Sequence, residues 1–446
     1  MLFGIAITGI DRDSAYAQTL ADIRLVQEAA HHVTGPRQYD GRPLSLQAAL
    51  DAVLGNNPDV IALRAQLPVV RERPTQARAL MPPMLEGTIW QWPINTVNPA
   101  NTNMYMFMLS QELPGRGKRA LHAAVADKDV TQAERDVAIR ERDVVNEVKH
   151  AYASLFIARQ AVDVQLASVD LLRQLADVSQ AKYAAGRSSQ QDVLKAVVEL
   201  SKLHNDILLL DEQAKIASAR LNILMNRAPE TPIGPLDDGR GPLTLPASAD
   251  LQRLAIDRNP DLQRARTDIE RAEAELASAK RAYAPDFTVQ AGYMLMPNQT
   301  DGVLARMGVT WPRAPWSRGK IDAHVAEQTA AVEVAKARER AMKNGVRLAV
   351  HEAYVHAKAA QDRAALLQTT ILPQSQQTLE VSRIAYQTNR VDFQAVIDNE
   401  RMVLDARLAY VRALSDLSQA TADLERAVGT DLPPNASVAV VSREGQ

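Results

Sequence analysis

The sequence predicts a mainly α-helical protein with a transmembrane β part, built from two tandem repeats that each run helix, β-hairpin, long helix, return helix. Most of the chain places apolar residues three and four positions apart, as amphipathic helices do. Residues 287–311 instead alternate apolar and polar side chains with the period of two that is typical of strands. Short segments also recur along the chain at one constant spacing, which indicates a duplication.

The strand-like segment 287–311 is interpreted as a β-hairpin with one apolar face. Its arms flank turn-forming residues at 297–302, and each arm has about the 9 to 11 residues that a tilted strand needs to cross a bilayer. Aromatic residues lie near the ends of the arms, where an interfacial girdle would lie. A less regular hairpin is predicted over 84–112, around a loop rich in proline and asparagine.

The duplication defines the expected domain organisation. Asn57-Pro58-Asp59 recurs as Asn259-Pro260-Asp261, and Arg116-Gly117-Lys118 recurs as Arg318-Gly319-Lys320. We therefore divide the chain into a leader (1–43), repeat 1 (44–228, hairpin 84–112), a linker (229–247), repeat 2 (248–430, hairpin 287–311) and a C-terminal tail (431–446).

The predicted helices also match between the repeats. First helices are expected at 44–80 and 248–283, very long helices at 119–183 and 320–386, and return helices at 191–225 and 393–428. Their apolar spacing and abundant alanine indicate coiled-coil packing at close approach. Pro373 should kink the second long helix, and Pro68 and Pro74 should interrupt the first short one.

Composition excludes several classes of protein. The formal net charge of -2, with no basic run that contains aromatics, argues against a nucleic-acid partner. The absence of cysteine excludes disulfides, thiolate metal sites, a cysteine nucleophile and a lipid-modified N-terminal cysteine. No uncharged apolar run reaches the length of a transmembrane helix, so none is expected.

The N-terminus leaves two interpretations open. Residues 2–10 are apolar, and Ala15-Tyr16-Ala17 resembles a small-residue cleavage site. However, no basic segment precedes the apolar run, and Asp11-Arg12-Asp13 interrupts it. Both a degenerate signal peptide and an ordinary flexible leader fit this pattern.

No catalytic motif stands out. His351 and His356 are five residues apart and fall on different helix faces, unlike the paired histidines of a zinc protease. Residues 115–118 lack the spacer of a phosphate-binding loop. His122 and His324 recur with the repeat, which indicates packing at matched positions. We therefore predict no enzyme and no cofactor.

The four predicted strands cannot function alone in a membrane. A bilayer permits only a closed barrel, because an open sheet edge would leave unpaired backbone groups in hydrocarbon. A barrel usually needs at least about eight strands, so the chain must oligomerise. A dimer would give a filled eight-stranded barrel, whereas a trimer would give twelve strands around a passage.

Several segments resemble the TolC-type outer-membrane efflux family in their order and spacing. They are residues 44–50 (LSLQAAL) before 56–59 (NNPD), 110–119 (SQELPGRGKR), Ala151-Tyr152 and 183–186 (YAAG). Residues 292–296 (GYMLM) and 311–320 (WPRAPWSRGK) look most like its heavy-metal branch. The hairpins and the segment between the repeats are shorter than usual for that family.

This resemblance implies a homotrimer with a 12-stranded β-barrel in the bacterial outer membrane, continued by a long periplasmic α-barrel. It further implies an exit duct of a tripartite efflux system that exports metal cations or small toxic compounds. The implied partners are outer-membrane lipid, a periplasmic membrane-fusion adaptor and an inner-membrane pump, expected to be of the resistance-nodulation-division type. The alternative is a soluble coiled-coil periplasmic adaptor or scaffold.

The resemblance also points to a pore gate near the second helix-to-helix turn. Asp398 looks like a gate aspartate of the family, whereas the companion position three residues earlier is Ala395. A ring of three carboxylates would select cations. The alternative is a solvated Asp398 paired with Arg401 on one helix face. Asp392, Asp192 and Glu400 are weaker gate candidates.

The two turn tips are candidate adaptor contacts. They are Gly186, Arg187 and Ser188 in the first repeat, and Asn389, Arg390 and Val391 in the second. Glycine and asparagine suit the left-handed residue that ends a helix, so the tips also fit plain turn chemistry.

Methionines concentrate in the hairpins. If the faces that carry Tyr105 and Tyr293 point to lipid, five methionines face the lumen: Met104, Met106, Met108, Met294 and Met296. Thioethers are soft ligands suited to Cu(I) or Ag(I). The alternative is that methionine merely fills a narrow, irregular interior.

Overall fold

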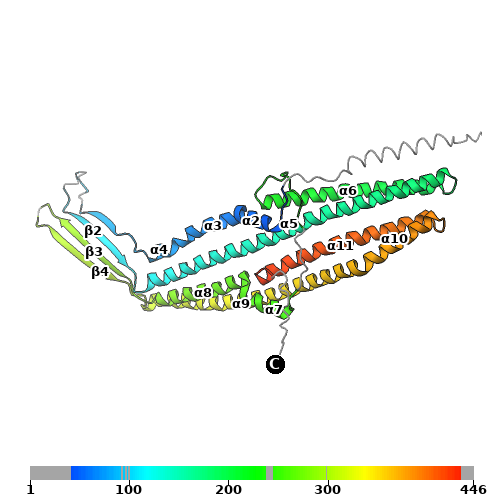
Figure 1. Ribbon diagram of the computed structural model, residues 1–446. Coiled ribbons are helices and arrows are strands. Elements are labelled where there is room, and N and C mark those ends of the chain that lie inside the picture. Colours follow the sequence, from blue (N-terminus) through cyan, green and yellow to red (C-terminus); the bar gives the residue numbers. More distant parts are fainter. Residues whose placement is uncertain are drawn as a thin grey trace, which may run out of the picture. The chain divides into compact units, whose positions relative to one another are not determined.

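The protein divides into two compact units, which we describe separately. The computed structural model describes residues 42–91, 94–95, 98, 101–237, 245–297 and 299–432 (Figure 1). Unit 1 contains the described residues of 1–58, 142–252 and 349–446, and unit 2 contains those of 59–141 and 253–348. Each unit therefore takes segments from both repeats. Most of the predicted leader and C-terminal tail lies outside the described residues.

Unit 2 contains a four-stranded antiparallel sheet. Its strands are β1 (Met84–Trp90), β2 (Met104–Leu113), β3 (Phe287–Leu295) and β4 (Gly302–Val309), in the order β1-β2-β3-β4 (Figure 1). Both predicted hairpins form. The central pair joins the two repeats, because Phe107 on β2 lies opposite Tyr293 on β3. Strands β1 and β4 remain as the edges of the sheet.

The helices of unit 2 accompany the first part of α5 (Lys118–Ala184), to which ion pairs join three of them. They are α3 (Pro58–Arg71), α4 (Arg73–Arg78), α8 (Pro260–Arg281) and the first part of α9 (Pro315–Leu366). Two rows of ion pairs at heptad spacing fix the register: Arg64–Glu141, Arg71–Glu134 and Arg78–Asp127 join α3 and α4 to α5, and Arg264–Asp136 and Arg271–Asp129 join α8 to α5. This regular repeat matches the predicted coiled-coil spacing.

Unit 1 is a helical bundle. Its helices are α2 (Leu46–Asn56), α6 (Gln190–Leu224), α10 (Leu372–Gln387), α11 (Phe393–Val428) and the later parts of α5 and α9, while α7 (Ser248–Arg258) crosses the boundary between the units. Leu172, Ile207 and Phe393 are almost completely buried in a core shared by α5, α6, α10 and α11. The apolar stripes of these helices therefore meet in one core, as their periodicity predicts.

The first helix of each repeat is broken at a position that the sequence analysis did not predict. The chain breaks at Asn57 between α2 and α3, and at Asn259 between α7 and α8. Asn259 adopts an extended conformation, its side chain accepts a hydrogen bond from the Leu262 amide, and proline occupies the first helical position. An Asn-Pro pair therefore ends one helix and caps the next, although the apolar spacing continues across it.

The prolines act differently from one another. Pro68 lies inside α3, so the predicted interruption there is wrong, whereas Pro74 lies in the first turn of α4. Pro373 also begins a helix, α10, directly after a π-helical turn, η2 (Leu367–Ile371). The second long helix thus starts at Pro315 and is divided by this turn, which accommodates the proline.

Candidate functional site

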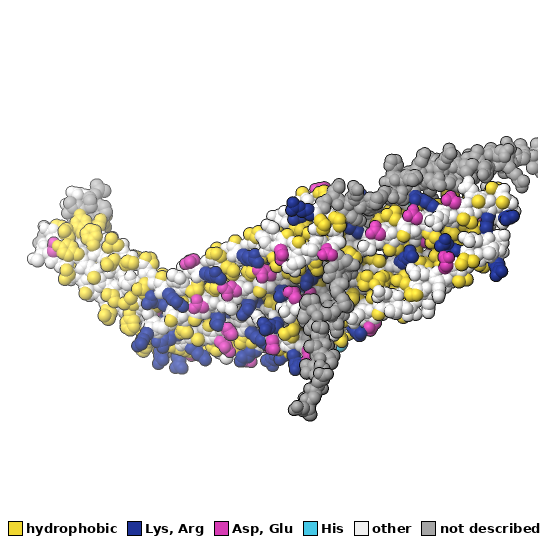
Figure 2. Space-filling model, viewed as in Figure 1, with side chains coloured by type: hydrophobic (Ala, Val, Ile, Leu, Met, Phe, Trp, Pro, Cys, Tyr) yellow, Lys and Arg dark blue, Asp and Glu magenta, His cyan; other side chains and the backbone are white. Residues whose placement is uncertain are grey.

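The sheet has two chemically different faces. One face carries only apolar side chains over its centre, and many of them are exposed: Leu85, Ile89, Phe107, Leu109, Val289, Tyr293, Leu295, Val303, Met307 and Val309. We call it the apolar face. On the side visible in Figure 2, the sheet carries few charged side chains, whereas the helices of the same unit carry many. An exposed apolar surface of this extent requires a cover.

The opposite face, which we call the mixed face, carries polar and thioether groups. The register places Glu86, Ser110, Gln290 and Arg306 on it together with five methionines: Met84, Met104, Met106, Met108 and Met294. On β3 the side chains of this face are less exposed than those of the apolar face. The sheet therefore brings four of the five predicted lumen methionines to one surface, and Met296 follows directly after β3.

A polar junction connects the strands to the helices of unit 2. The Asp286 carboxylate accepts hydrogen bonds from the Gly115 amide, at 2.7 Å, and from the Lys118 ammonium, at 2.8 Å. The Asp286 amide donates to the Thr310 hydroxyl at 2.7 Å. Burial works to raise the pKa of Asp286, but Lys118 and the Gly115 amide outweigh it and hold this pKa below its usual range. The sequence analysis did not identify this junction.

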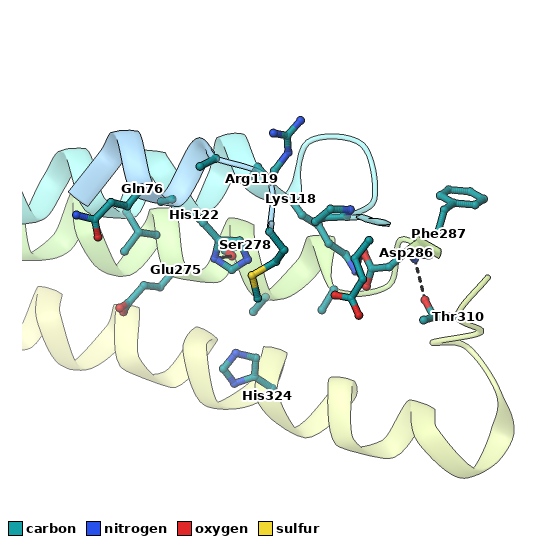
Figure 3. Close-up of a pocket in the computed structure, with 18 of the residues that line it drawn as sticks. Gln76, Lys118, Arg119, His122, Glu275, Ser278, Asp286, Phe287, Thr310 and His324 are labelled. Carbon is teal, nitrogen blue, oxygen red and sulfur yellow. Dashed lines mark hydrogen bonds and ion pairs between the residues drawn. The ribbon is translucent and has the colours of Figure 1, made fainter. Parts of the chain in front are cut away.

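A pocket of roughly 900 Å³ lies beside the junction. Gln76, His122, Glu275, Asp286 and His324 are among the residues that line it (Figure 3). His122 and His324 come from α5 and α9, and both side chains are exposed. The two histidines at matched positions of the repeats therefore line the same open pocket.

The two turn tips have the predicted helix-ending geometry. Gly186 and Asn389 adopt left-handed backbone conformations, with φ of 69° and 57°. The Arg187 amide donates to the Lys182 carbonyl, and the Arg390 amide donates to the Ala385 carbonyl, each at 2.8 Å. These bonds close both helix ends with the Schellman pattern. Arg187 and Arg390 are exposed beyond them, as docking residues would have to be.

A single lysine connects the two tips of one chain. The Lys182 ammonium, near the end of α5, donates to the Tyr386 carbonyl and, at 2.8 Å, to the Asn389 side chain. It also lies 3.8 Å from the centroid of the Tyr386 ring, as in a cation–π contact. Burial and the nearby Arg187 guanidinium lower the pKa of Lys182. Sequence reasoning missed this contact.

Three of the gate candidates lie in different environments on or before α11. Asp392 caps the helix, because its side chain accepts from the Ala395 amide at 3.0 Å. Asp398 is exposed, and its carboxylate accepts from the Gln394 amide group at 2.8 Å and lies 3.5 Å from Arg401. Glu400 is only 4% exposed, so it is turned into the helical core rather than toward solvent.

The predicted pair of Asp398 and Arg401 thus exists, but it is not the main contact of the arginine. Arg401 binds Glu199 on α6 through two hydrogen bonds, one of 3.1 Å from its Nε atom. Burial alone would raise the pKa of Glu199, but hydrogen bonds from Arg401 and Lys202 lower it. Because Arg401 is shared with Glu199, it neutralises the Asp398 carboxylate less than it would if the two residues formed an exclusive pair.

Glu400→Gln should stabilise the protein at neutral pH. Burial raises the pKa of Glu400, with a contribution from Glu199, against a hydrogen bond from Ser168 and the nearby Arg407 and Arg401. A raised carboxyl pKa makes the wild type lose stability as pH rises from the ordinary value of 4.5 through the raised one. The melting temperature of the variant should therefore exceed that of the wild type at pH 8 and equal it at pH 4.

The control for this measurement is Glu352→Gln, because Glu352 lies exposed on α9. It should leave the melting temperature unchanged at both pH values. If the melting temperature of Glu400→Gln exceeded that of the wild type by the same amount at pH 4 as at pH 8, ionisation of the Glu400 carboxyl group could not be the cause of the difference.

The described residues lack two features that would point to other functions. No group of three or more His, Cys, Asp or Glu side chains within them is arranged to hold a metal ion. Among the helices that the structure describes, none combines the length and the apolar character needed to cross a membrane.

A family model and a relative of known name both match most of the chain. The family model described as "Outer membrane efflux protein" matches residues 49–227 and 251–430. The cobalt-zinc-cadmium resistance protein CzcC of Cupriavidus metallidurans is 24% identical over 434 residues, covering 96% of this chain and 98% of that protein.

Solved structures of similar fold include two channels. The outer-membrane channel OprN has a TM-score of 0.73 at 18% identity, over 86% of this chain and 89% of its own. CusC, studied for its folding and transmembrane channel formation, has a TM-score of 0.71 at 16% identity, over 89% of this chain and 97% of its own.

Proposed function

Because the chain belongs to the outer membrane efflux protein family, we propose that it is the exit channel of a tripartite efflux system for metal cations. The name of the relative CzcC, a cobalt-zinc-cadmium resistance protein, supports the choice of cargo. The comparisons name channel and resistance proteins, and we assign no catalytic role. The sheet is the part that we place in the bacterial outer membrane.

The observation that carries this proposal is the two-faced sheet with open edges. Its exposed apolar face suits lipid, and its mixed face suits a water-filled lumen. Strands β1 and β4 are its unpaired edges, and hydrocarbon cannot satisfy their backbone groups. Pairing β4 of one subunit with β1 of the next removes every edge, and three subunits give twelve strands around a passage.

The helices support the same assembly. Exposed apolar side chains remain on α6, α9 and α10 after the core is formed: Leu194, Val198, Leu208, Ile216 and Ile223 on α6, and Val355, Leu366, Val381 and Ile384 on α9 and α10. Helix faces of this kind are covered by neighbouring helices in a bundle. We propose that the helices of adjacent subunits cover them and form the periplasmic α-barrel of a homotrimer.

Residues next to the strands suit the membrane interface. Trp311 and Trp316 are both exposed and pack edge to face, with ring centroids 6.0 Å apart. Exposed Arg313 and Arg318 lie beside them in the sequence. Tryptophan and basic residues of this kind anchor membrane proteins at the level of the lipid headgroups.

We assign the remaining roles to the turn region of unit 1. The exposed Asp398 carboxylates of three subunits would form a ring that favours cations, with the Asp392 caps nearby. The burial of Glu400 argues against its use as a gate residue. The exposed tips, including Arg187 and Arg390, would contact a membrane-fusion adaptor, which connects the channel to an inner-membrane pump of the resistance-nodulation-division type.

Planar-bilayer recording of the detergent-purified protein tests this function. The wild type should require detergent for extraction, migrate as a heat-sensitive trimer and conduct ions with a preference for cations. Asp398→Asn should keep the conductance but shift the reversal potential in a KCl gradient toward zero, because the neutral amide cannot attract cations.

A protein that purifies as a monomer without detergent and conducts no ions would overturn the channel and favour the soluble adaptor or scaffold. If Asp398→Asn left the reversal potential unchanged while conductance remained, the channel would stand and only the role of Asp398 would be wrong.

A further inference from the structure

We propose that Met106, Met294 and Met296 form a binding site for a soft monovalent cation, Cu(I) or Ag(I), on the mixed face of the sheet. The proposal rests on the proposed function, because it takes the mixed face to line the channel. It goes further by naming a class of cargo and the side chains that the cargo meets.

The register of the sheet places Met106 opposite Met294, and Met296 follows directly after β3. Met106 on β2 lies directly opposite Met294 on β3, and both side chains point to the mixed face. Directly opposed side chains in an antiparallel pair have Cβ atoms about 4.5–5.5 Å apart. Met296 lies two residues beyond Met294, and the two methyl groups converge next to Gly302.

Gly302 shows how close this convergence is. A Cβ atom at position 302 would lie 3.0 Å from the Met294 methyl carbon and 3.7 Å from that of Met296. The space that a side chain would occupy on β4 is therefore filled by two methionine ends. Met104 and Met108 flank Met106 on the same face of β2, so further thioethers continue along the strand.

The hairpin turn holds Met296 in place. The Asp301 carboxylate accepts a hydrogen bond from the Met296 amide at 3.1 Å and one from the Tyr293 hydroxyl at 2.5 Å. These bonds fix the backbone of Met296 just after β3, whereas a methionine side chain has three rotatable bonds and can adapt to a ligand. Ordered backbones with adaptable thioether ends suit a site that a passing cation occupies transiently.

The donor chemistry selects the ion. Neutral thioethers are soft ligands that favour Cu(I) and Ag(I), whereas Zn(II) and Co(II) favour imidazole and carboxylate ligands. Within the described residues no group of three or more His, Cys, Asp or Glu side chains offers such a divalent site. The site should thus discriminate between monovalent soft cations and divalent ones.

The competing explanation is that these methionines only fill space. Leucine has nearly the same volume and hydrophobicity but no sulfur, so exchange of methionine for leucine separates the two explanations. The test variant is the triple Met106→Leu, Met294→Leu, Met296→Leu. Met307→Leu is the matched control, because Met307 lies on β4 but on the apolar face.

The measurement is Ag(I) binding by the full-length protein in detergent and chloride-free nitrate buffer, followed by ¹³C-methyl-methionine NMR and by equilibrium dialysis. The wild type should bind Ag(I) with shifts of the Met106, Met294 and Met296 methyl signals. The triple variant should bind at least tenfold more weakly, the Met307→Leu variant should bind as the wild type does, and Zn(II) should shift none of these signals.

Bilayer conductance of the same samples separates the two proposals. A triple variant that conducts normally but has lost Ag(I) binding supports the site. Equal Ag(I) binding by the wild type and the triple variant, or no binding by a conducting wild type, overturns the methionine site while the channel stands. A wild type that does not conduct overturns the channel itself.

Discussion

Phe107→Arg should abolish assembly of the protein in the outer membrane, whereas Met108→Arg, one residue further along β2, should be tolerated. Phe107 lies on the apolar face with 54% of its surface exposed, near the middle of the strand. Arginine facing lipid near the bilayer midplane costs about 2–4 kcal/mol. Three subunits would each pay this cost, so the heat-sensitive trimer should disappear from outer-membrane fractions.

Met108→Arg is the matched control because it places the same charge at almost the same depth. Its side chain faces the mixed side of the sheet, opposite Glu86 on β1, where an arginine gains a cross-strand partner. Trimer yields for this variant should stay close to those of the wild type. Equal losses for both variants would contradict the assignment of the two faces, and equal tolerance would contradict the contact with lipid.

Gly115→Ala should destabilise the connection between sheet and helices of unit 2 by about 1–3 kcal/mol, and more if the backbone cannot shift. The added Cβ atom would lie 2.5 Å from the Pro285 carbonyl oxygen and 3.2 Å from the Ala284 Cβ atom. Asp286 prevents easy relief, since its carboxylate binds the Gly115 amide and the Lys118 ammonium. The variant should melt several degrees lower and yield less trimer.

Gly319→Ala provides the comparison. Gly319 lies in α9. Apart from its chain neighbours and the nearby backbone of its own helix, no atom lies within 4 Å of the position that an added Cβ atom would take. Alanine in a helix is favoured over glycine by about 0.5–1 kcal/mol, so this variant should melt at the same temperature as the wild type or slightly higher. If the Gly115→Ala protein melted at the same temperature as the Gly319→Ala protein, the junction would have to accommodate the added methyl group without a loss of stability.

The hairpins and long helices were predictable because their patterns are local. The alternation in 287–311 identified β3 and β4, and the duplication then located β1 and β2. The breaks at Asn57 and Asn259 were missed because apolar spacing continues across them, although each Asn-Pro pair was visible as a cap. Pro68 and Pro74 could not be told apart, because the outcome depends on where the helix starts rather than on the residue.

The features of the candidate site that could be predicted are those that depend on one short segment of the chain. The left-handed turn residues Gly186 and Asn389 and the alternation of methionines follow from short-range geometry. The contacts of Asp286 with Lys118 and of Arg401 with Glu199 join distant segments. Their existence depends on the relative register of strands and helices, which periodicity alone does not fix.

The Lys182 contact has a mechanical consequence. Its acceptors include the backbone carbonyl of Tyr386, which lies in the last turn of α10, also accepts a hydrogen bond from the Asn389 amide at 3.1 Å, and sits at the end of the helix that attracts a cation. The two helical hairpins of a subunit are thereby joined at their turns, so a force that pulls on one turn is passed to the other. An adaptor that bound only the first tip would therefore displace both. The two helical hairpins of a subunit would then move together on docking rather than independently.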